Sequence, residues 1–254
     1  MTEINASAIT EYLPDKYKPL SITAYKTVDS TNRAAKDMAA AGTSMPFLVV
    51  ADSQSAGRGR LGRSFYSPAS TGIYMSLTMG GFDAPQKALF ITSAAAVAVT
   101  DAIISLTGES PGIKWVNDIY LHDRKICGIL TEAQRLESEF AIIVGIGVNM
   151  TTTDFPEDIS DVAESLKTDI SREQMIAEIT KNLLEICKSP ENNNFIERYK
   201  KRSILLGKEI NYFAGGEKKS AMATDVDRNG GLVILDEQGN LIKLSSGEVT
   251  VRLK

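Results

Sequence analysis

One long apolar helix followed by four short apolar segments constrains the fold of this chain more than any other feature. Helical periodicity predicts the helix over residues 86–106. β-Strands are predicted over residues 47–51, 72–79, 113–116, 119–121, 126–132 and 140–148. Together these segments predict an α/β fold in which one mixed β-sheet is covered by flanking helices.

The parts of the chain on either side of these segments show helix start signals. An N-terminal arm precedes a helix that begins at the polar run Asp29-Ser30-Thr31-Asn32. A later helix begins at the capping box Ser171-Arg172-Glu173-Gln174. After Asn192-Asn193-Asn194, a further helix is expected to end near Leu206.

The sequence changes after Gly207 to short alternating strands. Turn signals lie at Gly215-Gly216, Asn229-Gly230-Gly231 and Gln238-Gly239-Asn240. This pattern predicts a small β-barrel, so we expect one domain over residues 1–206 and a second over residues 207–254.

Charge and composition argue against several classes of protein. The net charge of −4 and the pI near 5.3 disfavour a general nucleic-acid-binding protein, which would carry a basic face. The most apolar stretch, residues 88–106, contains polar residues such as Asp101, and the N-terminus lacks a secretion signal. Cys127 and Cys187 stand far apart without a CxxC motif. We therefore expect a reduced, cytoplasmic protein that binds neither DNA nor a membrane.

The run QSAGRGRLGR, residues 54–63, places three arginines and three glycines in one loop without a carboxylate. Guanidinium groups bind carboxylate or phosphate oxygens in pairs, and glycines allow close backbone approach. The run is therefore typical of an anion-binding loop that closes over its ligand. Three alternatives stay open for the loop alone: a mobile surface loop, an RGG-like nucleic-acid patch, and a turn whose arginines pair with remote carboxylates.

Polar residues also cluster in KWVNDIYLHDRKICGIL, residues 114–130, at the ends of a hairpin-like pair of apolar runs. Asp118 could hold Mg²⁺ beside a phosphate, because hard cations prefer carboxylate oxygen, and Lys125 would add a positive charge. The alternative is structural, with a turn at Asn117 and the lysines and tryptophan as ordinary strand-end and core residues. His122, the single histidine, lies in a predicted exposed turn, which disfavours a Ser-His-Asp triad.

The segment IVGIGVNM, residues 143–150, is an apolar strand interrupted by Gly145 and Gly147. Glycines within a strand often mark a bulge or the close approach of another group. For this segment alone, sheet packing and ligand contact explain the glycines equally well.

Five motifs occur in one order and together resemble the biotin protein ligase family. They are DSTN at residues 29–32, GRGRLGR at 57–63, KWVND at 114–118, RKICGIL at 124–130 and GIGVN at 145–149. The resemblance is close over residues 25–150 and continues more weakly to residues 247–252. It implies a catalytic domain similar to those of class II aminoacyl-tRNA synthetases, followed by a small SH3-like domain.

The resemblance also implies a two-step reaction. Biotin and Mg·ATP form biotinyl-5′-adenylate with loss of pyrophosphate. A lysine of the biotin carboxyl-carrier domain of a biotin-dependent carboxylase then attacks the acyl carbon. The cofactors implied are ATP and Mg²⁺, with biotin as the substrate.

Particular residues match the functional positions of the family. The catalytic groups that the resemblance implies are Arg58, Arg60, Asp118 and Lys125, with Asp118 also the metal ligand. The residues implied to bind biotin are Ser30, Thr31, Asn32, Gln54, Gly57, Arg58, Arg60, Lys125, Gly128 and Gly145. Those implied to bind the nucleotide are Arg60, Arg63, Phe65, Lys114, Asn117, Asn149 and Arg252. Whether Asp118 acts as a metal ligand or as the base for the acceptor lysine is open.

Two residues depart from the family pattern. Val116 stands where the family usually has proline, and Phe65 stands where a tryptophan is common. Neither change removes a catalytic group, and phenylalanine keeps an aromatic face for adenine. We expect both changes to affect affinity rather than the class of reaction.

Rival functions and the oligomeric state are open at this point. The chain starts too close to DSTN for the N-terminal helix-turn-helix domain of ligase-repressors, so a monofunctional ligase is expected. A lipoate ligase would share the chemistry but not these motifs, and a non-catalytic regulator would not need Asp118 and Lys125. A homodimer remains open. The arginine loop is expected to be mobile in the empty protein and ordered over a ligand.

Overall fold

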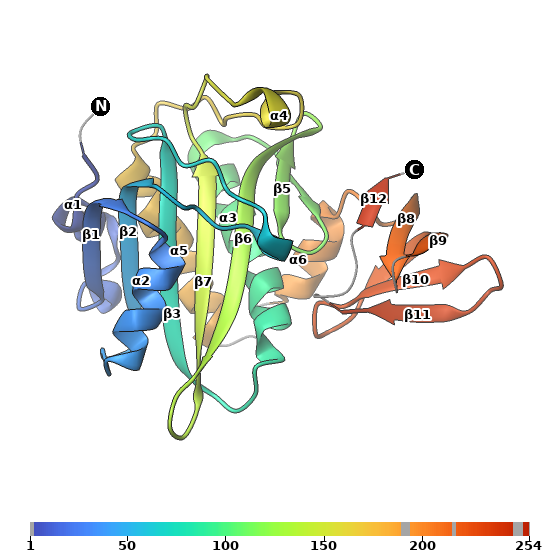
Figure 1. The fold of residues 1–254 in the computed structure, drawn as a ribbon, viewed down its shortest axis with the longest axis horizontal. Helices are drawn as coiled ribbons and strands as arrows, with labels where there is room; N and C mark the ends of the chain where they lie inside the picture. Colours follow the sequence, from blue (N-terminus) through green and yellow to red (C-terminus); the bar gives the residue numbers. More distant parts are fainter. Residues whose placement is uncertain (1–2, 189–193, 215–216, 246–250, 254) are drawn as a thin grey trace.

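The protein contains two β-sheets of different size, joined by helices (Figure 1). The computed structural model describes residues 3–188, 194–214, 217–245 and 251–253. A seven-stranded mixed sheet lies between helices, and a five-stranded antiparallel sheet follows it in sequence. The predicted fold class, a mixed α/β sheet with a small C-terminal β unit, is therefore confirmed.

The large sheet has the strand order β1-β2-β3-β7-β6-β5-β4. Its strands are β1 (Ser21–Val28), β2 (Phe47–Gln54), β3 (Gly72–Phe82), β4 (Gly112–Lys114), β5 (Asp118–Leu121), β6 (Arg124–Arg135) and β7 (Phe140–Asn149). Strands β1 and β2 run parallel, and the other neighbouring pairs run antiparallel. The predicted N-terminal arm is wrong, because it contains a helix and β1. No residue of β1 is buried, so its sequence lacks the apolar run that identified the other strands.

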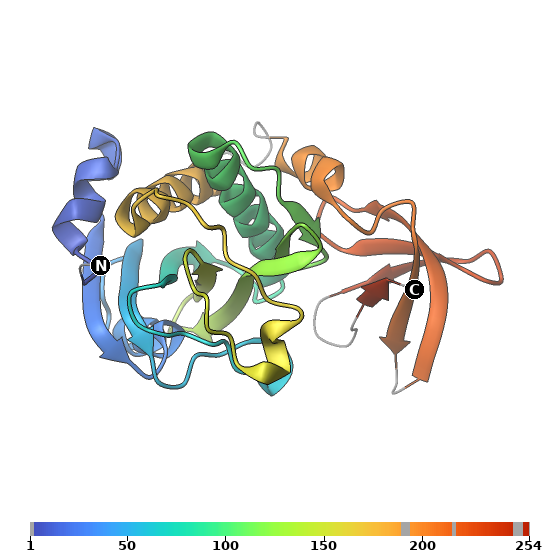
Figure 2. The same ribbon diagram turned by 90° about the horizontal axis from the view of Figure 1, so that it is seen from above.

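Helices cover both faces of the large sheet (Figure 2). They are α1 (Ala6–Tyr12), α2 (Thr31–Ala40), α3 (Lys87–Thr107), α4 (Glu157–Ser160), α5 (Arg172–Lys188) and α6 (Phe195–Arg202). On one face, Ala35 of α2 packs in a cluster with Phe47 and Val49. On the other face, Leu48 and Val50 join the main core together with α1, α3 and α5. Both faces of β2 are thus buried, which explains its continuous apolar sequence.

The long helix α3 is apolar enough to cross a membrane by length and composition. Within the protein, 67% of its most apolar window is buried, and it packs against α5, α6 and the sheet. It ends at Gly108, which adopts the left-handed conformation (φ 76°) favoured at helix C-termini. The prediction of a buried core helix is confirmed.

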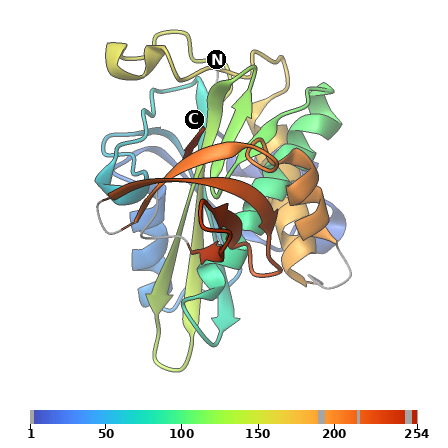
Figure 3. The same ribbon diagram turned by 90° about the vertical axis from the view of Figure 1, so that its right-hand side faces the viewer.

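The C-terminal sheet has the strand order β11-β10-β9-β8-β12 and lies in front of the large sheet in Figure 3. Its strands are β8 (Glu209–Ala214), β9 (Glu217–Val226), β10 (Leu232–Asp236), β11 (Leu241–Leu244) and β12 (Val251–Leu253). The predicted turns around Gly230 and Gly239 are confirmed, and both glycines have positive φ (85° and 84°). The predicted turn at Gly215-Gly216 lies outside the described residues. The helix expected to end near Leu206 ends earlier, at Arg202.

The C-terminal sheet contacts the larger unit beside β4. The Trp115 indole Nε1 donates a 2.8 Å hydrogen bond to the Gly230 carbonyl oxygen. A Cβ atom at Gly230 would lie 2.3 Å from Ser93 Oγ on α3, so this turn needs glycine for space as well as for its φ. Lys200 on α6 pairs with Asp225 on β9 at 2.8 Å. Trp115, considered above as a core residue, is buried at this contact.

Candidate active site

The arginine loop, defined here as residues 55–66 between β2 and β3, crosses the face of β7 and β6 (Figure 1). Phe65 of this loop lies over two strand glycines. A Cβ atom would lie 2.4 Å from the Phe65 ring at Gly147 and 3.2 Å from it at Gly128. Strand β7 pairs with both neighbours without a register shift at Gly147. The glycine in β7 therefore permits close approach of the loop rather than a bulge.

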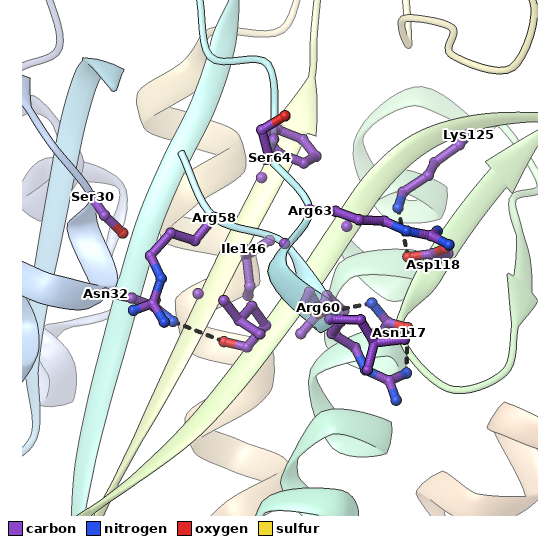
Figure 4. A pocket seen from close by; sticks show the side chains of 18 of the residues that line it. Ser30, Asn32, Arg58, Arg60, Arg63, Ser64, Asn117, Asp118, Lys125 and Ile146 are labelled. Atoms are coloured by element: carbon purple, nitrogen blue, oxygen red, sulfur yellow. Dashed lines mark hydrogen bonds and ion pairs between the residues drawn. The ribbon is translucent and has the colours of Figure 1, made fainter. Parts of the chain in front are cut away.

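A cavity of about 400 Å³ lies between the loop and the sheet (Figure 4). Its volume falls within the usual range for ligand pockets. The predicted site residues that line it are Ser30, Thr31, Asn32, Gln54, Arg58, Arg60, Arg63, Phe65, Lys114, Asn117, Asp118, Lys125, Gly128 and Gly145. The fold thus brings together motifs that are more than 100 residues apart in the sequence.

Neutral hydrogen-bonding groups gather at one end of the cavity. The Gln54 amide oxygen accepts hydrogen bonds from the Thr31 backbone nitrogen (2.9 Å) and hydroxyl (3.2 Å). Its amide nitrogen donates to Ser67 Oγ (2.9 Å). Ser30 is the N-cap of α2 by position, but its side chain does not cap the helix. This buried hydroxyl makes no hydrogen bond to the described residues, so it is free to meet a ligand.

Asn32 lies beside these groups, but contacts within the protein use its polar atoms. Its amide nitrogen donates to the Leu130 carbonyl (3.1 Å) and to Glu132 Oε2 (2.9 Å). Its amide oxygen accepts from Ser76 Oγ (2.7 Å). A Cβ atom at Gly145 would lie only 2.2 Å from that amide oxygen. The geometry therefore favours a role for Asn32 in shaping the cavity wall.

Charged groups gather at the other end of the cavity, where Figure 4 shows two paired contacts. Arg60 Nη1 donates to Asn117 Oδ1 at 3.0 Å. Lys125 Nζ lies 2.7 Å from Asp118 Oδ1. Burial lowers the pKa of Arg60, and the charge of Asp118 acts in the opposite direction. A guanidinium stays protonated despite such a shift, so this end of the cavity is cationic.

The donor set around Asp118 fits a magnesium ion held mainly by a ligand's phosphates. Mg²⁺ usually takes one or two protein carboxylates and completes its shell with water and phosphate oxygens. Asp118 supplies the single carboxylate among the described lining residues. Its Oδ1 atom lies 2.7 Å from Lys125 Nζ, so a bound metal ion would share this carboxylate with the ammonium group. No group of three metal-ligating side chains occurs among the residues that the structure describes.

Three predicted site residues do not line the cavity. Gly57 is buried within the loop itself, where a Cβ atom would lie 2.3 Å from the Phe65 carbonyl oxygen. The Asn149 side chain donates to the Glu164 carbonyl oxygen (3.1 Å). Arg252 lies in β12, and its side chain is outside the described part of the chain. The nucleotide contacts predicted for Asn149 and Arg252 stay predictions.

The structure also adds residues that the predicted site did not include. The cavity is also lined by Trp115, Tyr120, Ile159 and Val162. Glu132 does not line the cavity but contacts Arg58, which does. The sequence signal for Glu132 was a carboxylate at the end of an apolar strand. Ile159 and Val162 come from the irregular segment around α4, where no periodicity marks them. The Trp115–Val116 peptide bond is cis.

Two family models match this chain, one over the large sheet and one over the C-terminal sheet. Residues 24–149 match the biotin/lipoate A/B protein ligase family, and residues 205–252 match the biotin protein ligase C terminal domain. The biotin–[acetyl-CoA-carboxylase] ligase of Mycobacterium tuberculosis is 30% identical over 234 residues, which cover 87% of this chain and 85% of that protein. The chain belongs to the biotin protein ligase family. The predicted family is therefore confirmed.

Other members of the biotin protein ligase family support the fold. The biotin protein ligase from Aquifex aeolicus in complex with biotin and ATP has a TM-score of 0.78 and 28% identity, covering 92% of this chain and 99% of that chain. The bifunctional ligase/repressor BirA of Bacillus spizizenii is 41% identical over 142 residues. That match covers 55% of this chain and 44% of the Bacillus protein, so it spans less than half of that relative.

Proposed function

We propose that this member of the biotin protein ligase family activates biotin with Mg·ATP to biotinyl-5′-AMP and transfers biotin to a lysine of a carboxylase carrier domain. The observation that carries the proposal is the division of one cavity into an end with neutral hydrogen-bonding groups beside Arg58 and an end with Arg60, Lys114 and Lys125 (Figure 4). Ser30, Thr31 and Gln54 suit the neutral ureido group of biotin. The arginine loop, Lys114 and Lys125 suit its carboxylate and the phosphates of ATP.

The first step must bring two anions together. Two unit charges 4 Å apart repel by about 4 kcal/mol near a protein surface, so the biotin carboxylate cannot approach the α-phosphate unless cations neutralise both. Arg58, Arg60 and Lys125 line the same cavity and supply these charges. The carboxylate oxygen then attacks the α-phosphorus, and pyrophosphate leaves. Mg²⁺ held beside Asp118 would neutralise the departing phosphates.

The second step is attack by a lysine amine on the acyl carbon, with AMP as the leaving group. The amine must first lose a proton, because an ammonium group is not a nucleophile. Among the described residues that line the cavity, Asp118 is the one carboxylate, so it serves the reaction as the metal ligand, as the proton acceptor, or as both in turn. Lys125 Nζ lies 2.7 Å from Asp118 Oδ1 and lines the same cavity, so it is placed to contact the departing AMP.

ATP–pyrophosphate exchange tests the proposal directly. The assay compares biotin, lipoate and no acid in the presence of Mg²⁺, and is followed by transfer to a biotin carrier domain. Exchange above background with biotin alone, then labelling of the carrier lysine, is expected. A carrier domain with its acceptor lysine replaced by arginine is the matched control and should stay unlabelled.

The other outcomes assign different functions. Exchange that depends on lipoate would change the substrate, since the matched family includes lipoate ligases. A folded protein that binds biotin without catalysing exchange would be a binding or regulatory protein. A homodimer, a cytoplasmic location and the absence of DNA binding stay predictions. The domain boundary at residue 207 also stays one.

A further inference from the structure

Glu132, on β6, is a carboxylate that the proposed reaction does not use. Its side chain is 15% exposed and lies between two cations and an amide. Lys36 Nζ is 2.6 Å from Oε1, and Asn32 Nδ2 donates to Oε2 at 2.9 Å. Because Asn32 is itself held by Ser76, the carboxylate has a fixed position on the sheet.

Arg58 of the arginine loop reaches this carboxylate with both ends of its guanidinium. Nη1 lies 3.3 Å from Glu132 Oε2, and Nη2 lies 3.3 Å from Oε1. The contact combines one hydrogen bond, from Nη1, with an ion-pair contact from Nη2, so further N–H donors of Arg58 remain for another anion. Arg58 also lines the cavity, so one side chain joins the loop to the sheet and faces the ligand space.

Glu132 is ionised at neutral pH. Its burial acts to raise its pKa, but hydrogen bonds from Lys36 and Asn32 and the charges of Lys36 and Arg58 outweigh this effect and lower the pKa below its usual value. Two cations therefore share one carboxylate. Without this negative charge, Lys36 and Arg58 would repel each other.

We propose that Glu132 is a positioning residue that holds the arginine loop over the cavity through Arg58 and so slows the release of bound ligand. The identity of that ligand rests on the proposed function, whereas the holding of the loop does not. The second attachment of the loop, Arg60 to Asn117, lies at the opposite end of the cavity. With Glu132 absent, the side-chain attachments of the loop among the contacts described are the Arg60 hydrogen bond and the packing of Phe65 against Tyr74 and the strand glycines.

Hydrogen exchange of the empty protein tests the holding of the loop. The Ser55 and Ala56 amides donate to the Val28 and Asp29 carbonyl oxygens outside the loop, so their exchange reports loop opening. In Glu132→Gln we expect exchange of both amides to be about fivefold faster, the effect of losing one partly exposed ion pair. The matched control is Glu178→Gln on α5, whose carboxylate is 22% exposed, pairs with Lys181 and lies away from the cavity.

Ligand release provides the second readout. Dissociation of pre-formed biotinyl-5′-AMP should be about fivefold faster from Glu132→Gln than from the wild type. Its rate of formation in a single turnover at saturating biotin and ATP should change less than twofold, because the reacting groups remain. Lys36→Met leaves the Arg58–Glu132 contact in place, so it should not speed release.

A double-mutant cycle separates this role from general damage to the wall. If Glu132 acts through Arg58, adding Glu132→Gln to Arg58→Ala should produce no further increase in loop exchange or release. Equal loop exchange in wild type and Glu132→Gln would overturn the proposal while leaving the ligase function intact. Slower release from Glu132→Gln would also overturn it, because Glu132 would then compete with the ligand for Arg58. Absence of pyrophosphate exchange in the wild type would instead reject the ligase function and leave the hydrogen-exchange test valid.

Discussion

The two sides of the cavity differ in how their polar groups are held. On the sheet side, Thr31, Asn32 and Ser76 are almost fully buried and hydrogen-bonded to one another or to neighbouring strands. On the loop side, Leu61 is 62% exposed, and Arg58 and Arg63 are also exposed. The sheet side therefore has a fixed shape, whereas the loop side depends on a few side-chain contacts.

This difference suits the two kinds of group in the proposed substrates. A neutral ring with directional hydrogen bonds is recognised best by a rigid wall, because misplaced donors and acceptors lose most of their binding energy. Charged groups tolerate small displacements, since Coulomb interactions fall off slowly with distance. A loop that carries arginines can thus open for entry and still neutralise its ligand after closing.

The largest expected effect is a loss of stability when a glycine on the sheet side is replaced, compared with the same change in the loop. Gly145→Ala would place a Cβ atom 2.2 Å from the buried Asn32 amide oxygen, so we expect it to lower the free energy of unfolding by about 2–4 kcal/mol. It should also weaken biotin binding. The matched change Gly59→Ala in the loop meets its nearest atom at 3.3 Å, and the loop can shift, so a loss below about 1 kcal/mol is expected. Urea unfolding measures both, and equal losses would show that the two sides are equally rigid.

Replacement of Arg60, which donates to Asn117, is expected to change stability less but to speed the release of biotinyl-5′-AMP. Arg60→Ala should change the free energy of unfolding by less than about 1 kcal/mol, because the side chain faces the cavity. It should speed the release of biotinyl-5′-AMP about 10- to 100-fold through the loss of charge-assisted hydrogen bonds. Arg33→Ala, an exposed arginine on α2 outside the cavity, is the control. An unchanged release rate for Arg60→Ala would remove its assigned role.

The smallest expected effect is the pH dependence of the stability that the Arg58–Glu132 contact contributes between the loop side and the sheet side. The pKa of Glu132 in the folded protein lies below its usual value of 4.5, so its ionised form stabilises the fold. The stability difference between wild type and Glu132→Gln, about 1 kcal/mol or less, should be complete above pH 4.5. It should disappear as the pH falls through the folded-state pKa. Urea unfolding of both proteins across this range checks the sign, and a difference that grows on acidification would contradict the assignment.

On the sheet side of the cavity, sequence patterns predicted the positions of strands better than the contacts between their residues. Continuous apolar runs located β2, β3 and β7, because strands buried on both faces need such runs. They missed β1, whose residues all remain at least partly exposed. For the glycines at 145 and 147, the sequence left sheet packing and ligand contact equally open, and it did not indicate that Asn32 and Phe65 approach them.

On the loop side, the sequence predicted which charged residues the loop carries. It did not predict which residues of the sheet they contact. The alternative in which its arginines pair with remote carboxylates holds for Arg58, which meets Glu132, and anion binding is proposed for the same side chain. Pairing across 74 residues leaves no periodic signal, so local sequence could not identify it. For the same reason, the hydrogen bond from Trp115 to Gly230, 115 residues away, came only from the structure.

The sequence by itself determined the family, the buried sheet-forming segments and the charged and neutral groups available for chemistry, because these depend on residue type, order and short-range periodicity. The tertiary structure alone decided which of these groups face the cavity and which hold others in place. The side chains of Asn32, Asn149 and Glu132 are engaged by residues distant in sequence. These contacts, and not their residue types, give them supporting positions. Such contacts depend on the packing of strands and loops in space, which local patterns do not encode.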